Sequence, residues 1–415
     1  MKLPSLSLVL LALAAPTAAF AQRGDLPPAE QVLQALDSHP GVEAAAARVA
    51  AARAHGDILR RGPHEVTLSS SYNRRNVQGA GERNDFDVTL SRPFRLPGKT
   101  ALDGKAGALE VEVAENRRED VRHQTALLLS GLWHDWLTAG SHCRNDLDTV
   151  RGLETSLAAL RRRVALRDAS ALDVDQASAA LAQARAQAAA SLAAREQARV
   201  TLAATFPEIA LPPEPPELAA PDLPPDDLAR MRDSVVERSH EIRAADREAQ
   251  RLDVVSRRVR ADRVADPSFG VRLFSEQGGL EKGAGVTMSI PLGGGYRRAA
   301  ADQAAADANA ARLELINIQR TVTAVADADL SNARTRTVVW QSAAASARSA
   351  SDAVVRTRRG YELGQIDLAD LLYAQRQAND ARRYEIDTRS EASRALLKLQ
   401  IDSHSIWSPD DESGR

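Results

Sequence analysis

The stretch "NDFDVTLSRPFRLPGKTALDGKAGALEVEVAENRREDV", residues 84–121, changes its pattern partway along. Up to Pro93, apolar and polar residues alternate with the period of two that is typical of a strand. After Pro97 and Gly98 the sequence becomes a long run of alanine, leucine and charged residues without proline, which favours a helix. The chain is therefore predicted to pass from a half-exposed strand directly into a very long helix.

Four segments alternate in this way, and they pair into two predicted hairpins. The first lies within residues 64–94 around the turn sequence "VQGAGER", and the second within residues 267–292 around "GGLEKG". One face of the strands is apolar, and the other carries small hydroxylated and charged residues. This pattern suits a strand between lipid and water. It also suits a soluble hairpin packed on a helix, and the strands alone leave both interpretations open.

The sequence repeats at an interval of roughly 200 residues, which bears directly on the architecture. "DVTLSRPFRLPGKTA" from Asp87 corresponds to "GVTMSIPLGGGYRRA" from Gly285, and "ALDVDQASAALAQA" from Ala171 corresponds to "LADLLYAQRQANDA" from Leu368. Each half is therefore predicted to contain a helix, a β-hairpin, a very long helix and a long returning helix.

These patterns divide the chain into nine predicted segments. They are a signal peptide at 1–21, an N-terminal helical segment at 22–63, the first hairpin at 64–94, the first long helices at 95–205, a proline-rich extended linker at 206–235, a helical segment at 236–266, the second hairpin at 267–292, the second long helices at 293–402 and a C-terminal tail at 403–415. Gly131 and Gly140 are interpreted as bends in the first long helix.

Composition indicates the compartment and limits the class of protein. Lys2, the apolar residues after it and the Ala-Phe-Ala ending at Ala21 are typical of a secretory signal peptide. Hydrophobic residues make up 44% of the chain but aromatics only 4%, which favours long packed helices over a large globular core. A net charge of −2 gives no electrostatic reason to expect nucleic acid, and the single Cys143 excludes an intrachain disulfide. No segment after residue 21 is apolar enough for a transmembrane helix.

Three motifs carry a resemblance to a known family. "SRPFRLPGK" from Ser91, "SIPLGGGYRRA" from Ser289 and "GYELGQIDLADLLYAQ" from Gly360, with the signal peptide and the duplication, resemble the TolC-type outer-membrane efflux proteins over nearly the whole mature chain. The first motif is most similar to the heavy-metal, CzcC-like branch. The resemblance implies a mainly α-helical homotrimer with a small β part: a 12-stranded outer-membrane β-barrel that continues into a periplasmic α-helical barrel. Four strands are too few to close a bacterial barrel, and three chains would supply twelve.

The resemblance also implies a function. It predicts a passive outer-membrane duct of a tripartite efflux system, in contact with outer-membrane lipid, which passes metal ions or drugs from an inner-membrane pump of the RND type and a periplasmic adaptor. It implies no cofactor and no enzymatic activity. The alternative interpretation is a soluble periplasmic coiled-coil adaptor or scaffold, although such a protein needs one central hairpin rather than tandem pairs.

The resemblance places the functional residues at two kinds of position. The predicted periplasmic gate or selectivity residues are Asp370, Asp173, Tyr361 and Gly364. The predicted strand-to-helix junctions are Pro93, Pro97, Gly98, Pro291 and Gly293. In the second helical tip, Ile366 stands where a basic residue is common in the family, and Tyr373 stands where a second acid can occur. Three copies of Asp370 would form a carboxylate ring that favours cations, whereas the plainer interpretation of Asp370 and Asp173 is that they cap helices.

Other candidate chemistry is weaker. His134 and His142 lie about 12 Å apart along a helix and cannot share one metal ion within a chain. We therefore interpret them, together with Cys143, as ordinary surface positions and predict no metal site. The three glycines at 293–295 lack the lysine and hydroxyl of a phosphate loop and are interpreted as a backbone hinge.

Overall fold

The structure of the chain is a computed structural model that describes residues 25–79, 81–221 and 225–408. The predicted signal peptide and residues 409–415 of the predicted tail lie outside the described residues. The first half contains α1 (Ala29–Asp37), α2 (Pro40–Arg61), β1 (Thr67–Val77), β2 (Gly81–Pro93), α3 (Lys99–Ala165) and α4 (Ala171–Thr205). The second half contains α5 (Pro225–Arg238), α6 (His240–Ala261), β3 (Ser268–Glu276), η1 (Gln277–Gly279), β4 (Glu281–Ser289), α7 (Gly295–Glu362) and α8 (Leu368–Asp402).

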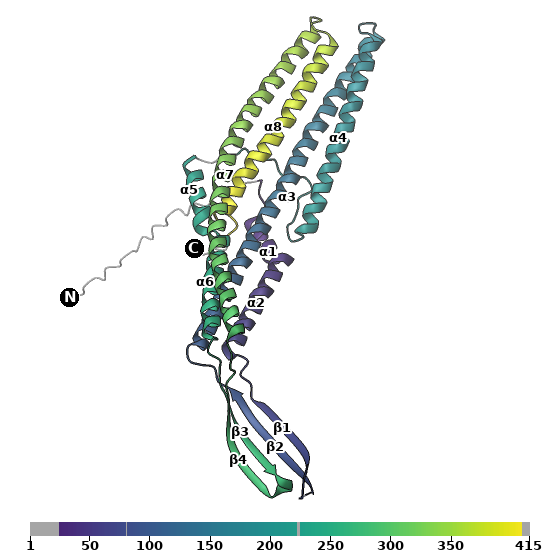
Figure 1. The fold of residues 1–415 in the computed structure, drawn as a ribbon. Coiled ribbons are helices and arrows are strands. Elements are labelled where there is room, and N and C mark those ends of the chain that lie inside the picture. The colour runs from purple at the N-terminus through teal and green to yellow at the C-terminus, as the bar shows by residue number, and fades with distance from the viewer. Residues whose placement is uncertain (1–24, 80, 222–224, 409–415) are drawn as a thin grey trace, which may run out of the picture.

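The two halves repeat one plan. From α2 and from α6 onward, each half runs helix, hairpin, very long helix and returning helix. The lengths correspond closely, because α2 and α6 have 22 residues each, α4 and α8 have 35 each, and α3 and α7 have 67 and 68. The helices form a long rod, and the strands project together from one end of it (Figure 1).

The strands form a single antiparallel sheet in the order β1-β2-β3-β4. Pairing of Leu90 with Val271 joins the two halves at the β2–β3 seam. Leu68, Leu90, Val271 and Val286 lie side by side on one face and are 68%, 51%, 55% and 82% exposed. No described helix covers either face of the sheet (Figure 1), so these hairpins are not packed on a helix. Within the described chain, the outer edges of β1 and β4 have no partner strand.

The four long helices form one layer. Helix α3 packs against α4 and α8, and α8 packs against α7, which gives the order α4-α3-α8-α7 (Figure 1). At about 1.5 Å per residue, α3 is roughly 100 Å long. No described helix holds a stretch that is both long and apolar enough to span a membrane.

Neither Gly131 nor Gly140 interrupts α3, which is one continuous helix. Gly140 has a different physical role. A Cβ atom added there would lie 2.0 Å from Cγ of Pro215, so the missing side chain lets the inter-repeat linker approach the helix. An added Cβ at Gly131 would meet nothing within 4 Å.

The main core lies near the middle of the rod, where α1, α3, α8 and the linker meet. Leu129 and Trp136 of α3, Phe206 at the start of the linker and Trp407 after α8 are buried together there. Arg144 Nη1 donates to the carbonyl oxygen of Pro215 at 2.9 Å. The extended linker is shorter than the proline content predicts, because α5 already begins at residue 225.

Candidate functional site: helical tips and strand-to-helix junctions

The two helical tips have the same backbone geometry. In the first, the N–H of Asp168 donates to the carbonyl of Arg163 at 2.8 Å, and in the second, the N–H of Gln365 donates to Gly360 at 2.9 Å. Both hydrogen bonds are of the Schellman type, which ends a helix when the residue just before the N–H donor has a left-handed conformation. Gly364 supplies that residue in the second tip with φ 72°. Arg167 takes the same place in the first tip with φ 61°. A residue with a side chain therefore adopts the left-handed conformation that glycine supplies in the second tip.

The predicted acids occupy equivalent positions but make different contacts. Asp173 closes a capping box with Ser170, since its carboxylate accepts from the Ser170 N–H at 3.0 Å and its own N–H donates to Ser170 Oγ at 3.1 Å. In the second tip the cap is Asp367, whose carboxylate accepts from the N–H of Asp370 at 2.8 Å. The Asp370 carboxylate itself is exposed and has no partner among the described residues. Of the two predicted acids, Asp370 is therefore the one whose carboxylate no described hydrogen bond or ion pair engages.

Tyr361 connects the two tips. The guanidinium of Arg163, which also pairs with Asp168 at 2.9 Å, lies 5.4 Å from the centroid of the Tyr361 ring. Below this contact, Leu157 and Leu160 of α3 pack in one apolar cluster with Leu368 of α8. A cation over an aromatic face adds roughly 0.5–1 kcal/mol at an exposed site, so the tips are held together mainly by the apolar cluster.

The first strand-to-helix junction turns at Pro97 and Gly98. Gly98 is the N-cap of α3 and has φ 88°, which favours glycine. Pro93 is the last residue of β2. It still pairs with Ser268, and the N–H of Phe94 donates to the carbonyl of Pro267 at 2.8 Å. Proline lacks only its own N–H, so the next residue can continue the pairing.

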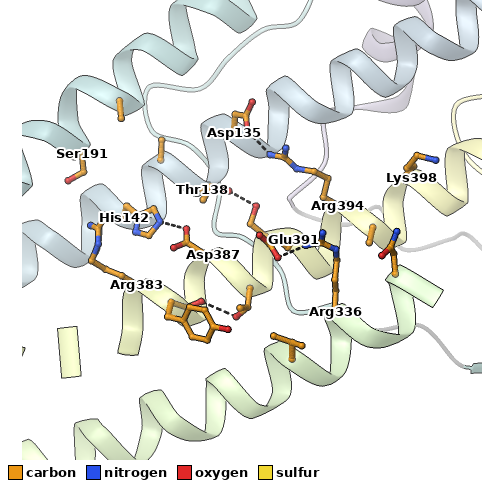
Figure 2. Close-up of a pocket in the computed structure, with 18 of the residues that line it drawn as sticks. Asp135, Thr138, His142, Ser191, Arg336, Arg383, Asp387, Glu391, Arg394 and Lys398 are labelled. Atoms are coloured by element: carbon orange, nitrogen blue, oxygen red, sulfur yellow. Dashed lines mark hydrogen bonds and ion pairs between the residues drawn. The ribbon is translucent and has the colours of Figure 1, made fainter. Parts of the chain in front are cut away.

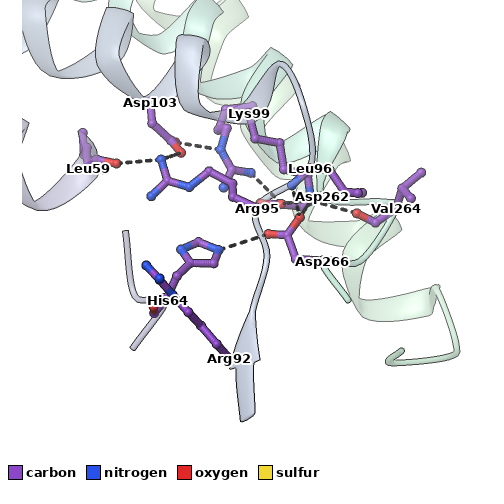
Figure 3. Close-up of polar contacts among 11 residues, drawn as sticks. Leu59, His64, Arg92, Arg95, Leu96, Lys99, Asp103, Asp262, Val264 and Asp266 are labelled. Atoms are coloured by element: carbon purple, nitrogen blue, oxygen red, sulfur yellow. Dashed lines mark hydrogen bonds and ion pairs between the residues drawn. The ribbon is translucent and has the colours of Figure 1, made fainter. Parts of the chain in front are cut away.

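A buried cluster of charged side chains fixes this junction (Figure 3). Lys99 is only 2% exposed, and its Nζ contacts the carboxylates of Asp262 at 2.9 Å and Asp266 at 2.8 Å and the carbonyl of Val264 at 2.8 Å. Burial alone would raise the pKa of Asp266, but the hydrogen bonds from Lys99 and from the backbone N–H of Leu96 lower it below its ordinary value. The start of α3 is thereby tied to the chain that enters β3.

A second group of ion pairs extends the same cluster. Asp103 accepts from Arg95 at 2.9 Å and from Arg258 at 2.6 Å, and Arg95 Nη1 also donates to the carbonyl of Leu59 at the end of α2. The cluster therefore joins α2, α3 and α6 with three cations and three carboxylates. The sequence did not predict this cluster. The available signal was the four-residue spacing of Lys99 with Asp103 and of Arg258 with Asp262 beside each hairpin.

The second junction is built differently. Gly293 has φ 96°, and an added Cβ there would meet nothing within 4 Å. Pro291 and Gly293 are exposed, and their carbonyl oxygens accept hydrogen bonds from the Arg297 guanidinium. The described residues place no counterpart of the Lys99 cluster at this junction. One junction is fixed by buried charge, and the other is an exposed glycine-rich turn.

A cavity of about 1270 Å³ lies on one face of the helical layer, lined by residues of all four long helices (Figure 2). Its wall carries ion pairs, including Arg394 with Asp135 at 2.6 Å and Arg336 with Glu391. Arg389 donates to the linker carbonyl of Leu218 at 3.2 Å. By the helical repeat, Arg389 lies on the side of α8 opposite the residues that line this cavity. The cavity therefore opens on the face that the linker leaves uncovered.

The prediction that His134, His142 and Cys143 are surface residues is wrong for two of the three. His134 and Cys143 are buried in the core. Burial lowers the pKa of His134, whose Nδ1 lies 2.9 Å from the carbonyl oxygen of Ser130, and burial raises the pKa of the Cys143 thiol. His142 Nε2 pairs with Asp387 at 2.7 Å. No three His, Cys, Asp or Glu side chains within the described ranges have the geometry of a metal site.

Several solved structures have a similar fold. The chain is 15% identical to CusC, a protein described for its transmembrane channel formation, over 90% of this chain and 91% of that one, with a TM-score of 0.75. It is 21% identical to the outer-membrane channel OprN (92% and 91% covered, TM-score 0.74) and 16% identical to the outer membrane protein VceC of Vibrio cholerae (90% and 95% covered, TM-score 0.73). No family model and no curated protein sequence matches the chain. At these identities the likeness establishes that the chain shares the fold of these three structures.

Proposed function

We propose that three copies of this chain form a channel in the outer membrane that continues as a helical duct through the periplasm. The observation that carries this proposal is the four-stranded sheet with an exposed apolar face and two unpaired edges, which continues into the helical layer. An open edge presents unpaired backbone groups, and these groups need partners in lipid. Pairing β4 of one copy with β1 of the next satisfies both edges, and three copies give twelve strands.

Exposed apolar residues at the two edges of the helical layer also support assembly of several copies. Leu313 and Val338 of α7 are exposed at one edge of the layer, and Leu192 and Val200 of α4 are exposed at the other. By the helical repeat, Val338 lies opposite Ala343 and Ala347, which are buried on the inner side of α7. We propose that this edge of α7 packs against the α4 edge of a neighbouring copy. The helical layers of three copies then form a closed ring, as the three sheets form a closed barrel.

The two faces of the layer then have different environments. The linker and α5 pack on one face and point outward in this arrangement, whereas the face with the 1270 Å³ cavity lines the duct. Its paired charges make a polar wall with no strong excess of either sign among the pairs described above. Such a wall suits passage of hydrated solutes and supplies no bond chemistry.

We place the gate at the helical tips. Three Asp370 carboxylates around the axis would attract cations at the mouth, and the Arg163–Tyr361 contact would hold the tips of each copy together. We further propose that the tips dock on a periplasmic adaptor joined to an inner-membrane pump of the RND type. The pump would supply the energy and choose the cargo, such as heavy-metal cations or drugs.

The first test is the cellular fraction and the mass of the mature protein after detergent extraction. We expect an outer-membrane protein with three times the chain mass that conducts ions in planar bilayers. A soluble monomer would overturn the proposal and favour the periplasmic adaptor interpretation. Deleting the genes of the partner pump and adaptor should abolish export through this protein, and unchanged export would contradict the passive duct.

A further inference from the structure

Three histidine rings meet at the joint between helices of the two halves. His404, which follows α8, lies with its ring centroid 5.6 Å from that of His123 on α3 and 4.9 Å from that of His240 at the start of α6. Both contacts are edge-on, with interplanar angles of 66° and 67°. A cavity of about 310 Å³ adjoins the three rings. His404 also has φ 54°, a left-handed conformation that histidine, asparagine and aspartate adopt more often than other residues with a side chain.

Charged groups face this cluster from every element packed around it. They are Asp120 of α3, Arg238 of α5, Glu241 and Arg243 of α6, Asp329 of α7, and Lys398 and Asp402 of α8. The carboxylate of Asp402 is already engaged, because it pairs with His123 Nε2 at 3.0 Å and with Lys398 Nζ at 2.6 Å. A proton on His404 would therefore add positive charge beside two other imidazoles and two arginines.

The segment 403–408 connects this cluster to the main core. Its backbone folds back onto the end of α8, since the N–H of His404 donates to Ile401 and the N–H of Ser405 donates to Gln400, both at 2.9 Å. At its far end Trp407 is buried in the main core, and its carbonyl accepts from Arg122 Nη1 at 3.2 Å. The segment is thus held by the histidine rings at one end and by one indole at the other.

We propose that the three histidines form a pH-sensitive clamp, in which protonation of His404 releases segment 403–408 from the joint of α3, α6 and α8. The proposal concerns a part of the fold away from the helical tips and stands whether or not the chain forms a channel. Release would withdraw Trp407 from the core that joins α1, α3, α8 and the linker. Acidification would therefore loosen the middle of the rod.

The direction of the pH effect follows from the titration of His404. Burial, and then the neighbouring His240 and His123, lower its pKa to about 4 in the closed clamp. A released histidine titrates near its ordinary pKa of about 6.5. The closed clamp is thus favoured in full above that pH, and release becomes up to about tenfold more favourable for each pH unit from 6.5 down to about 4.

Glu241 opposes part of this effect. Burial, and then Asp120, raise the pKa of its carboxyl group, so the closed clamp takes up that proton more readily than the released form. A raised carboxyl pKa favours the closed form as the pH falls. The observed slope should therefore be smaller than that of His404 alone.

The test is amide hydrogen exchange of residues 403–405 in the full mature chain in detergent, between pH 7.5 and 5. After correction for the intrinsic pH dependence of exchange, we expect protection to fall by roughly 10-fold to 30-fold. In His404→Asn, whose side chain tolerates the left-handed backbone and carries no charge, protection should lose this pH dependence. The matched control is His55→Asn, because His55 lies on α2 in an exposed pair with Glu110 and should leave the response unchanged.

Acrylamide quenching of tryptophan fluorescence gives a second readout that needs no variant. Withdrawal of Trp407 from the core should increase quenching between pH 7.5 and 5. Equal protection of residues 403–405 at both pH values would overturn the proposal, as would the same loss of protection in His404→Asn as in the wild type. Detergent-extracted mass separates this result from the channel proposal, since trimers without a clamp response would refute only the clamp.

Discussion

Single residues distinguish the two helical tips. The backbones are equivalent, yet Asp173 is used in a capping box while Asp370 keeps a carboxylate without a partner in the described chain. The sequence predicted both acids as candidates and left open whether they cap or gate. It could not separate them, because Ser170 and Asp367 are both good capping residues and only the contacts show which carboxylate remains available.

We predict that Asp370→Asn weakens block of the channel by multivalent cations. The substitution removes three charges from the proposed ring, so the blocking concentration in planar bilayers should rise by about tenfold or more. The melting temperature should change little, because the carboxylate has no described partner and an exposed acid in the first turn of a helix adds only about 0.3–1 kcal/mol. Glu314→Gln, an exposed acid far along α7 from the tips, is the control. If both variants shift the block equally, the effect is general surface charge and Asp370 is not the selective residue.

The buried lysine at the first junction gives a prediction for stability. Lys99→Met should lower the free energy of unfolding by about 1–3 kcal/mol, since it removes the buried ammonium that Asp262, Asp266 and the carbonyl of Val264 share. Urea unfolding followed by circular dichroism measures the change. Lys105→Met, on an exposed face of the same helix, should stay within about 0.5 kcal/mol. A small effect at Lys99 would mean that water or rearrangement compensates the two acids.

At the scale of whole elements, substitution of the glycines of α3 tests how firmly the linker is held against this helix. Gly140→Ala should destabilise the protein by about 1–3 kcal/mol, because the new Cβ would overlap Pro215. Gly131→Ala meets no neighbour and should stabilise α3 by up to about 1 kcal/mol through helix propensity. Thermal unfolding of the two variants should therefore move in opposite directions. Stabilisation by both would show that the linker moves aside at little cost.

The elements that the sequence predicted well are those with strong periodicity. Alternation at Val88 and Leu90 placed both residues on the apolar face of β2, and the alanine-rich runs without proline predicted the long helices. The sequence predictions were wrong where a proline or glycine serves a contact with residues distant in the chain, or begins a helix rather than a loop. Proline near residue 225 begins α5 rather than extending the linker, and Gly140 serves a contact 75 residues away along the chain. The Lys99 cluster depends on such distant contacts throughout.

At the scale of the whole molecule, the outer edge of α7 tests closure by neighbouring copies. Val338→Asp places a charge at the proposed interface and should convert detergent-extracted trimers to monomers, while the helical content of each chain stays the same. Ser351→Asp, an exposed position on the opposite side of α7, should leave trimers intact. Mass measurement in detergent separates the outcomes. Stable Val338→Asp trimers would move the interface away from this edge.

The meeting of the linker with both ends of the described chain has a consequence for connectivity. Trp133 Nε1 donates to the carbonyl of Asp25 at 2.7 Å, and Trp407 lies in the same core as Ile209 and Leu218 of the linker. A circular permutant that joins residue 408 to residue 25 by a short peptide and opens the chain after Pro221 would keep every helix and strand. The order of the two repeats would be reversed, and the same rod and sheet should form.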